Sequence, residues 1–503
     1  MPLAEVRTRY IVGINTTPST VEVDISQGLP GFILIGLSDS TARGIRARVR
    51  SAMLNSGYHF PAKKITLSLT PGPHLGDTAG YDLPIALAIL IASGQVQLKR
   101  HGHVEFYAGL SLNGSLTGCK GAISAMLAAA DAKHQIVVAQ QLFSPELIFA
   151  TETVYYAENL RQVCRYLQGE PIATTNTFNK QTVCPESPFV DIQSIVGLYH
   201  AKRALEIAAA GGHSLLMVGP PGSGKTTLAR CLPSLLPELT PEEKIAVAQV
   251  RNLFKSHLLQ PLSRPFRNPH HSITAAGLIG STHPEAPGEI TLAHRGVLFL
   301  DELLEFDKKT LDALRTPLEQ GYVLLSRARA KIIYPASFQL VAATNLPYGY
   351  ALSEFKTRNA RSALGKSIEI LSAALIDRFQ LSIAVSASLD GSTSLHHESS
   401  LAIKSRICTA RALQNKRQGK ENARLNSREI SLYCQLTLED WDWLKDSLQQ
   451  LSLSHRAFHH ILRVARTIAD LNGEDEITKV ALQEALSYRY TDRIIKHLTQ
   501  LYQ

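Results

Sequence analysis

The chain is 503 residues long, and 45% of its residues are hydrophobic while 19% are charged. This length favours two to four domains, and this composition is typical of globular proteins rather than disordered or fibrous ones. The formal net charge of +9 permits a polyanionic partner without requiring one. The six cysteines are scattered without a C-x-x-C pair, so neither a disulfide framework nor a zinc ribbon is predicted.

No segment is predicted to contact a membrane or to direct secretion. The most apolar run, residues 83–92, is about half the length of a membrane span. The first residues lack the apolar core and the small-residue cleavage site of a signal peptide. We therefore expect a cytoplasmic protein.

Residues 1–167 are predicted to form an α/β domain of their own, because short β-like runs alternate with helical ones. The predicted elements are strands at residues 8–14, 21–25, 32–36, 64–69 and 135–139 and helices at residues 39–55, 81–93 and 122–133. A polar stretch without periodicity, residues 168–190, is interpreted as a linker.

The rest of the chain divides into two further regions. Residues 191–390 alternate strands and helices in the manner of a parallel sheet, which is typical of an α/β core. Residues 391–503 have only helical periodicity and are predicted to form a helical domain. The expected fold class is thus α/β and multidomain, with a helical lid at the carboxyl end.

A strand, a glycine-rich loop and a helix follow one another at residues 214–235. The loop residues are Gly219, Pro220, Pro221, Gly222, Ser223, Gly224, Lys225, Thr226 and Thr227. They match the pattern G-x-x-x-x-G-K-[ST] in the strand–loop–helix context that supports a phosphate-binding loop. Lys225 is expected to contact the β- and γ-phosphates of ATP, and the Thr226 hydroxyl to hold Mg²⁺.

Polar residues at the ends of two further apolar strands complete the predicted ATP site. The run Val297–Leu300 ends in Asp301 and Glu302, which are expected to hold Mg²⁺ and to act as the base for the attacking water, respectively. A later strand ends at Asn345, whose amide could orient that water. A strand-ending turn residue is the alternative interpretation of Asn345.

Longer motifs around these residues resemble those of a known family. They are RPFRNPHHS at 264–272, GEITLAH at 288–294, GVLFLDEL at 296–303, YDLPIAL at 81–87 and ILRVARTIADL at 461–471. Together they resemble the magnesium-chelatase-like AAA+ ATPases, and among these the bacterial ComM/YifB branch, over nearly the whole chain. The resemblance also implies a ribosomal-S5/Lon-protease-like fold for the amino-terminal domain.

The resemblance implies a homohexameric ring whose ATP sites are shared between neighbours. Arg378, within LIDRF, matches the arginine finger of the family, and Arg456, within SHRA, matches its second sensor arginine. A guanidinium that faces the transferring phosphoryl group stabilises its charge. The implied function is an ATP-driven DNA motor, a helicase for branch migration that promotes integration of single-stranded DNA in natural transformation.

Three cations give modest independent support for DNA as a partner. Arg327, Arg329 and Lys331 alternate along a hairpin-like segment, so one strand face would carry all three beside single-stranded or branched DNA. A solvated strand face fits the same pattern equally well.

At two places the sequence departs from the patterns of related families, and these departures limit the activities that we predict. Family members usually continue after the sensor asparagine with N-P-C-P-C-G, whereas this chain has no cysteine between Asn345 and Cys408, and residues 346–370 differ from the family. Lon-type proteases pair Ser and Lys, but here Thr78 or Ser124 would have to serve, with Ile123 at the Lys position. We therefore predict no peptidase activity.

The histidines His270, His271, His283 and His294 invite a metal interpretation, which we disfavour because no carboxylate or thiolate clusters with them in sequence. No zinc is predicted, and ATP with Mg²⁺ are the expected cofactors. A chelatase-type ATPase that remodels a protein partner and a Lon-like protease or chaperone remain alternatives to the DNA motor.

Overall fold

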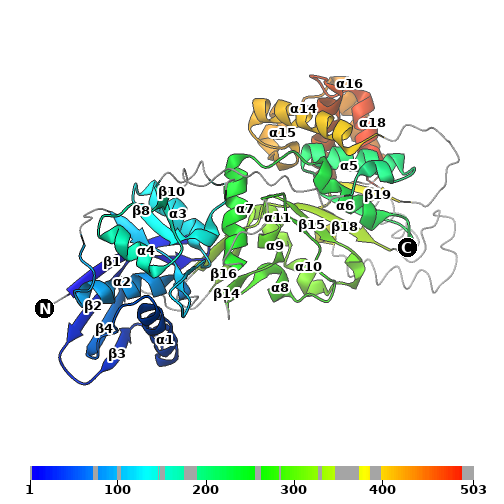
Figure 1. The fold of residues 1–503 in the computed structure, drawn as a ribbon. Helices are drawn as coiled ribbons and strands as arrows, with labels where there is room; N and C mark the ends of the chain where they lie inside the picture. Colours follow the sequence, from blue (N-terminus) through cyan, green and yellow to red (C-terminus); the bar gives the residue numbers. More distant parts are fainter. Residues whose placement is uncertain are drawn as a thin grey trace.

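The structure is a computed structural model that describes residues 3–71, 78–98, 103–144, 147, 153–174, 190–254, 262–282, 285–326, 331–345, 373–385, 398–451 and 453–489. Within them the chain forms an amino-terminal α/β region, a second α/β region and a group of carboxyl-terminal helices (Figure 1). Among the described residues, none of the helices combines the length and the apolar character needed to cross a bilayer.

An eight-stranded mixed sheet is the centre of the amino-terminal region, with the order β10-β9-β8-β5-β1-β2-β4-β3. Its strands are β1 (Leu3–Val12), β2 (Asn15–Ser26), β3 (Gly31–Ile35), β4 (Lys64–Thr70), β5 (Val104–Phe106), β8 (Gln135–Ala139), β9 (Val154–Ala157) and β10 (Ala173–Thr174); β6 (Gly109–Leu110) and β7 (Leu116–Thr117) form a separate pair. The strand predicted over residues 8–14 instead ends at Val12. The chain reverses at Gly13, whose φ of 62° favours glycine.

Helices α1 (Asp39–Asn55), α2 (Asp82–Ala92), α3 (Ala122–Asp131) and α4 (Leu160–Leu167) accompany this sheet. The helix predicted over residues 39–55 forms over those residues, because Ser38 caps it by accepting a hydrogen bond from the Thr41 amide. The apolar helix α2 is almost wholly buried, and its carboxylate Asp82 is 1% exposed. Arg48 of α1 donates two hydrogen bonds to Asp82, at 2.6 and 2.9 Å, which compensates the buried charge.

The second region contains a five-stranded sheet whose strands are all parallel, in the order β12-β15-β18-β11-β19. They are β11 (Leu215–Val218), β12 (Phe266–Arg267), β15 (Val297–Leu300), β18 (Gln339–Thr344) and β19 (Leu381–Ala384). Every residue of β11 and β15 is buried, as expected for strands covered on both faces. The parallel order brings the carboxyl ends of all five strands to one edge, which is called the carboxyl edge below; the opposite edge is the amino edge.

Helices and two hairpins surround this sheet. The helices are α5 (Tyr199–Gly211), α6 (Lys225–Leu235), α7 (Pro241–Phe254), α8 (Ala275–Ile279), α9 (Glu289–Leu292), α10 (Lys308–Asp312), α11 (Arg315–Gln320) and α13 (Ala373–Ile376). The hairpins pair β13 (Gly280–Thr282) with β14 (Glu285–Pro287) and β16 (Tyr322–Ser326) with β17 (Lys331–Pro335). Short 3₁₀ turns lie at Ala79–Tyr81, Gln140–Leu142, Ile192–Ser194, Leu303–Glu305 and Asn422–Arg424.

The carboxyl-terminal helices pack against α5 and α6 (Figure 1). They are α14 (Ser400–Gln418), α15 (Ser427–Tyr433), α16 (Leu438–Leu451), α17 (His455–Asn472) and α18 (Lys479–Ser487). His213, which is fully buried, joins the two parts through Gln380 Oε1 at 2.5 Å and Thr467 Oγ1 at 2.8 Å. Burial lowers the pKa of His213 to about 4, so the imidazole is neutral at pH 7.

The amino-terminal region contacts the second region through α3 and α7. Asn252 of α7 is fully buried; its Nδ2 donates to the Cys119 carbonyl at 3.1 Å and its Oδ1 accepts from the Ile123 amide at 3.0 Å. The β1–β2 turn also lies against the β16–β17 hairpin, since a Cβ on Gly13 would come within 2.7 Å of Ile332. Two separate contacts therefore fix the amino-terminal region on the parallel-sheet region.

Candidate active site

The glycine-rich loop lies between β11 and α6 at the carboxyl edge of the parallel sheet. Gly222 and Gly224 have φ values of 76° and 89°, in the left-handed region that favours glycine. Lys225 is 6% exposed, and its Nζ donates to the carbonyl oxygens of Gly219 and Pro220 at 2.9 and 2.7 Å. Burial lowers the pKa of Lys225 from its ordinary value. The lysine thus presents donors beside the loop, where phosphate oxygens could accept them.

The remaining loop residues differ in exposure. Ser223 is 4% exposed, and its Oγ accepts a hydrogen bond from Lys225 Nζ at 3.2 Å. Pro221 and Thr227 are exposed. Gly219 has no room for a side chain, because a Cβ there would lie 2.1 Å from the carbonyl oxygen of Val385. The fold therefore requires glycine at the start of the loop.

Thr226 and Asp301, the two expected magnesium ligands, lie in contact. Thr226 Oγ1 donates to Asp301 Oδ2 at 2.8 Å, since α6 and β15 meet at the carboxyl edge. Mg²⁺ binds oxygen ligands, and these two neighbouring side-chain oxygens meet that requirement. The residues present therefore fit a magnesium–nucleotide complex, with Lys225 beside the phosphates and Thr226 and Asp301 beside the ion.

Glu302, the expected base, has an unusual backbone. Its φ of 52° is left-handed, which costs a non-glycine residue about 1–2 kcal/mol, and such strain is common at functional sites. The side chain is 51% exposed, so water can reach the carboxylate. His271 Nδ1 lies 3.3 Å from Glu302 Oε2. The pairing of β12 with β15 carries the loop that contains His271 to this place.

Asn345 follows β18 at the same edge and is exposed. The strand before it is anchored to the glycine-rich loop, because the Gly219 amide donates to the Thr344 carbonyl at 3.2 Å. The structure therefore brings Asn345, the loop and the acid pair to one edge of the sheet, each from a different strand.

Arg378 lies at the amino edge instead. Its carbonyl oxygen accepts a hydrogen bond from Ser214 Oγ at 2.6 Å, and Ser214 directly precedes β11. The glycine-rich loop follows β11, whose four residues span about 13 Å at roughly 3.3 Å per residue. The guanidinium of Arg378 pairs with Glu319. Arg378 is therefore directed away from the loop of its own chain.

Arg456 lies beside Arg378 rather than beside the loop. It belongs to the first turn of α17, and its guanidinium is 3.9 Å from Glu319 Oε1. Glu319, near the end of α11, thus contacts both arginines that the family resemblance assigned to the ATP site. No signal in the sequence indicated that His271 would neighbour Glu302 or that Glu319 would neighbour the arginines.

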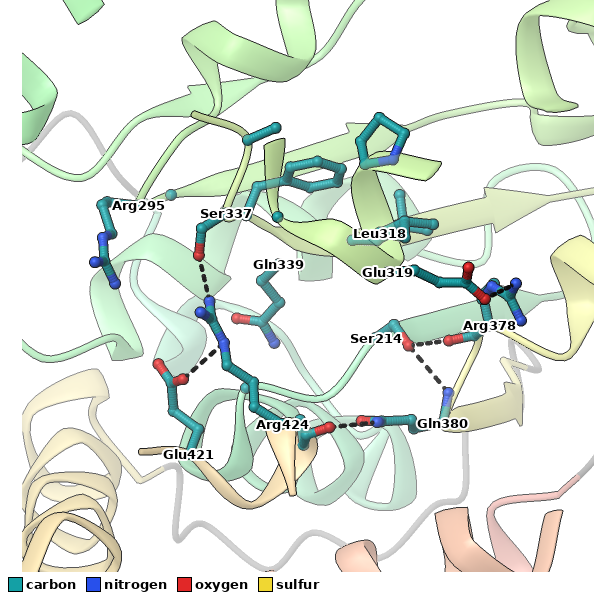
Figure 2. A pocket seen from close by; sticks show the side chains of 18 of the residues that line it. Ser214, Arg295, Leu318, Glu319, Ser337, Gln339, Arg378, Gln380, Glu421 and Arg424 are labelled. Carbon is teal, nitrogen blue, oxygen red and sulfur yellow. Dashed lines mark hydrogen bonds and ion pairs between the residues drawn. The ribbon is translucent and has the colours of Figure 1, made fainter. Parts of the chain in front are cut away.

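A cavity of about 450 Å³ extends from these arginines between the amino edge and the carboxyl-terminal helices (Figure 2). Its charged lining residues are Arg264, Arg295, Arg378, Arg411, Arg424, Arg456, Arg463, Glu243, Glu319 and Glu421. Arg424 donates to Ser337 Oγ at 2.5 Å and pairs with Glu421 at 3.0 Å, as Figure 2 shows. The arginines outnumber the glutamates, so the cavity is suited to an anionic group.

Buried polar atoms in the cavity lining also lack partners among the described residues. They are Nε of Arg295, Nε of Arg378 and Nδ1 of His460. Burial lowers the pKa of His460 well below its ordinary value, so that ring is neutral. An unpaired buried donor is costly, which makes this edge receptive to an acceptor from outside the chain.

Of the cations expected to contact DNA, the structure describes only Lys331, on the β16–β17 hairpin. Lys331 begins β17 opposite Ser326 and is exposed, whereas Arg327 and Arg329 lie outside the described residues. The other face of the hairpin is apolar and buried, with Ile332 and Tyr334 each 2% exposed. The hairpin therefore presents Lys331 on its open face.

Of the histidines that suggested a metal site, His270 and His271 have neighbouring rings, with 4.1 Å between their centroids, whereas His294 makes its contact elsewhere. His294 is 7% exposed, and its Nδ1 accepts a hydrogen bond from the Ser337 amide at 3.0 Å. His270 contacts Ser272, His271 contacts Glu302, and His283 lies outside the described residues. Within the described ranges, no three His, Cys, Asp or Glu residues form a group that could hold a metal ion.

Neither Ser124 nor Thr78, the residues considered for peptidase chemistry, contacts a lysine among the described residues. Ser124 is 3% exposed, and its Oγ accepts a hydrogen bond from Gln249 at 3.4 Å, in the contact between α3 and α7. Thr78 precedes a short 3₁₀ turn and makes no side-chain cap there. The segment 346–370, where the sequence departs from the family, lies outside the described residues.

Comparison with known proteins agrees with these motifs. Family models match three parts of the chain: magnesium chelatase subunit ChlI at residues 191–392, the ChlI C-terminal region at 397–489, and subunit ChlI of Mg-chelatase at 21–141. Full-length relatives include uncharacterized protein YifB of Salmonella typhimurium, 44% identical over 512 residues, and competence protein ComM of Haemophilus influenzae, 42% identical over 510. Both alignments cover 100% of each chain.

A more distant likeness covers only part of the chain. The magnesium-chelatase 67 kDa subunit of Chlorobaculum parvum is 31% identical over 151 residues, which are 29% of this chain and 22% of that protein. The mixed α/β architecture, with its parallel sheet and carboxyl-terminal helices, is consistent with the AAA+ fold of these proteins.

Proposed function

Because the chain belongs to the ComM/YifB family of magnesium-chelatase-like ATPases, we propose that it is a ring-forming ATPase that moves DNA strands. Family membership supports ATP hydrolysis with Mg²⁺, and the Thr226–Asp301 contact fits that chemistry. The finer assignment is a homohexameric helicase for branch migration, which promotes integration of single-stranded DNA.

The proposal of a ring rests on one observation, which is that the two halves of the expected ATP site lie at opposite edges of the parallel sheet. Lys225, Thr226, Asp301, Glu302 and Asn345 gather at the carboxyl edge. The arginine finger at Arg378 and the sensor at Arg456 belong to the amino edge. Arginines that catalyse phosphoryl transfer must contact the γ-phosphate, so these two would act on the nucleotide of a neighbouring subunit. A ring places every amino edge against the next carboxyl edge.

DNA is the proposed substrate for two reasons. A relative that aligns along the whole chain bears the name competence protein, which favours a role in natural transformation. The exposed Lys331, with Arg327 and Arg329 shortly before it in sequence, supports a cationic hairpin that contacts the phosphate backbone. A chelatase-type ATPase that remodels a protein partner is the second candidate, favoured only by the partial likeness to a chelatase subunit.

Several further assignments belong to the proposal. They are a ribosomal-S5/Lon-like domain at 1–167, a linker at 168–190, an AAA+ core at 191–390 and a helical lid at 391–503. We place the protein in the cytoplasm, without peptidase activity and without zinc.

A strand-migration assay tests the proposal. The wild type is incubated with three- or four-strand DNA junctions, ATP and Mg²⁺ beside the Lys225→Ala and Glu302→Gln variants. We expect ATP-dependent migration by the wild type alone, with ATP turnover stimulated by single-stranded or branched DNA. If the wild type neither binds DNA nor moves strands across a series from low to physiological salt, DNA is not the substrate.

A further inference from the structure

Glu319 occupies a central place at the amino edge. It is the last but one residue of α11, which Gly321 caps with a φ of 73°. Its carboxylate pairs with Arg378, which precedes β19, and lies 3.9 Å from the guanidinium of Arg456 on α17. Three distant segments of the chain therefore meet at one carboxylate, and Figure 2 shows Glu319 and Arg378 pointing toward each other.

The three side chains differ in how much water they contact. The Arg378 side chain is 13% exposed, and its Nε is buried without a partner among the described residues. Glu319 is 54% exposed and Arg456 is 41% exposed. A charged arginine that is so little hydrated needs an anion nearby, and Glu319 supplies it in the isolated subunit.

The pairing is nevertheless weak enough to be replaced. Because Glu319 is 54% exposed, water screens its charge, and an ion pair screened in this way shifts an equilibrium by a factor of at most about five. A phosphate group carries more charge than a carboxylate and can accept bidentate hydrogen bonds from arginine. A phosphate that reached this edge would therefore compete successfully for both guanidinium groups.

We propose that Glu319 is a positioning residue that holds Arg378 and Arg456 until the γ-phosphate of a neighbouring subunit displaces it. Before assembly, Glu319 keeps two like charges side by side and oriented. During assembly it competes with the incoming nucleotide, so the subunits join more weakly than the arginines alone would allow. This inference rests on the shared site proposed above.

The test removes the charge of Glu319 and keeps its size. ATP turnover per subunit is measured over a range of protein concentrations for the wild type and Glu319→Gln. Assembly is followed by analytical ultracentrifugation with a non-hydrolysable ATP analogue. We expect the midpoint concentration to fall about two- to fivefold in the variant, with the maximal rate changed less than twofold.

A matched control and a double variant separate this effect from general loss of surface charge. Glu398 is 53% exposed and pairs with Arg406 away from the cavity, so Glu398→Gln should leave the midpoint unchanged. Combining Glu319→Gln with Arg378→Ala should abolish the shift, because the competition requires the arginine.

The possible results distinguish this inference from the proposed function. If the wild type assembles and its rate depends on concentration, an unchanged midpoint in Glu319→Gln overturns the role of Glu319 alone. A maximal rate as low as that of Arg378→Ala would also overturn it, because Glu319 would then be needed in the active ring. A wild type that neither assembles nor depends on concentration contradicts the shared site itself.

Discussion

The carboxyl and amino edges of the parallel sheet differ in how far one chain satisfies them. At the carboxyl edge, Thr226 bonds Asp301 and Lys225 bonds the carbonyl oxygens of its own loop. At the amino edge, the buried Nε atoms of Arg295 and Arg378 have no partner among the described residues and lie beside an arginine-lined cavity. One edge is thus ready to bind nucleotide within a subunit, while the other has donors that only an outside group can use. The difference supports the proposal that the reaction requires two copies of the chain.

The largest expected effect on this difference between the two edges comes from removing Arg378. We expect Arg378→Ala to lower ATP turnover about a thousandfold, because an arginine finger stabilises the charge of the phosphoryl group in transit. Nucleotide binding to the loop of the same chain should persist. Steady-state hydrolysis and binding of a fluorescent ATP analogue measure the two effects.

Mixing variants shows on which subunit the arginine acts. Arg378→Ala retains an intact loop and Lys225→Ala retains an intact arginine, so mixed rings would contain some complete shared sites. Turnover by the mixture should exceed the sum of the two variants alone. No excess would mean that Arg378 acts within its own subunit or not at all. Arg428→Ala, at an exposed position on α15, is the control.

Acid is expected to weaken the contact between the parallel-sheet region and the carboxyl-terminal helices. Burial lowers the pKa of His213 to about 4 in the folded state, compared with about 6.5 when unfolded. Between these values the unfolded chain binds the extra proton, so stability is full above pH 6.5 and falls as the pH drops towards 4. At pH 5 the loss from this histidine is about 2 kcal/mol.

Urea unfolding at pH 7 and pH 5 measures that loss. Burial also lowers the pKa of His294 to about 4, so protonation of His294 is expected to add to the loss of stability in acid. His213→Gln should reduce the difference in unfolding free energy between the two pH values. An unchanged difference would show that His213 does not control the acid sensitivity.

The smallest expected effect concerns the contact between His271 and the Glu302 carboxylate. His271→Ala should lower kcat about tenfold with little change in ATP affinity, because a misplaced base loses part of its contribution. His270→Ala is the matched control, since His270 contacts Ser272 rather than the carboxylate. Equal effects of the two substitutions would contradict a specific role for His271. Single-turnover hydrolysis separates this step from nucleotide release.

Much of the carboxyl edge could be predicted from sequence. Parallel strands bring their carboxyl ends together, so a loop, an acid pair and an asparagine that each follow an apolar strand were expected to meet. The structure places them at that edge, and the family assignment is confirmed by relatives that align over the whole chain. The end of β1 was predicted wrongly, because the β-like run was extended through Gly13, where the chain reverses.

The amino edge was only partly predictable. The family resemblance named Arg378 and Arg456, yet nothing in the sequence indicated that they share Glu319 or face a cavity. Residues 319 and 378 are 59 positions apart, and their meeting depends on how α11 packs near the start of β19. The contact between His271 and Glu302 likewise depends on the pairing of β12 with β15.

By itself the sequence determined the chemistry of the phosphate-binding loop, because the glycines, the lysine and the flanking strand and helix are local neighbours. It also determined which strand ends carry acids and an amide. Only the tertiary structure decided that the loop and the arginines lie at opposite edges of one sheet. The physical reason is that strand direction and helix packing, which are properties of the whole core, set where distant side chains point.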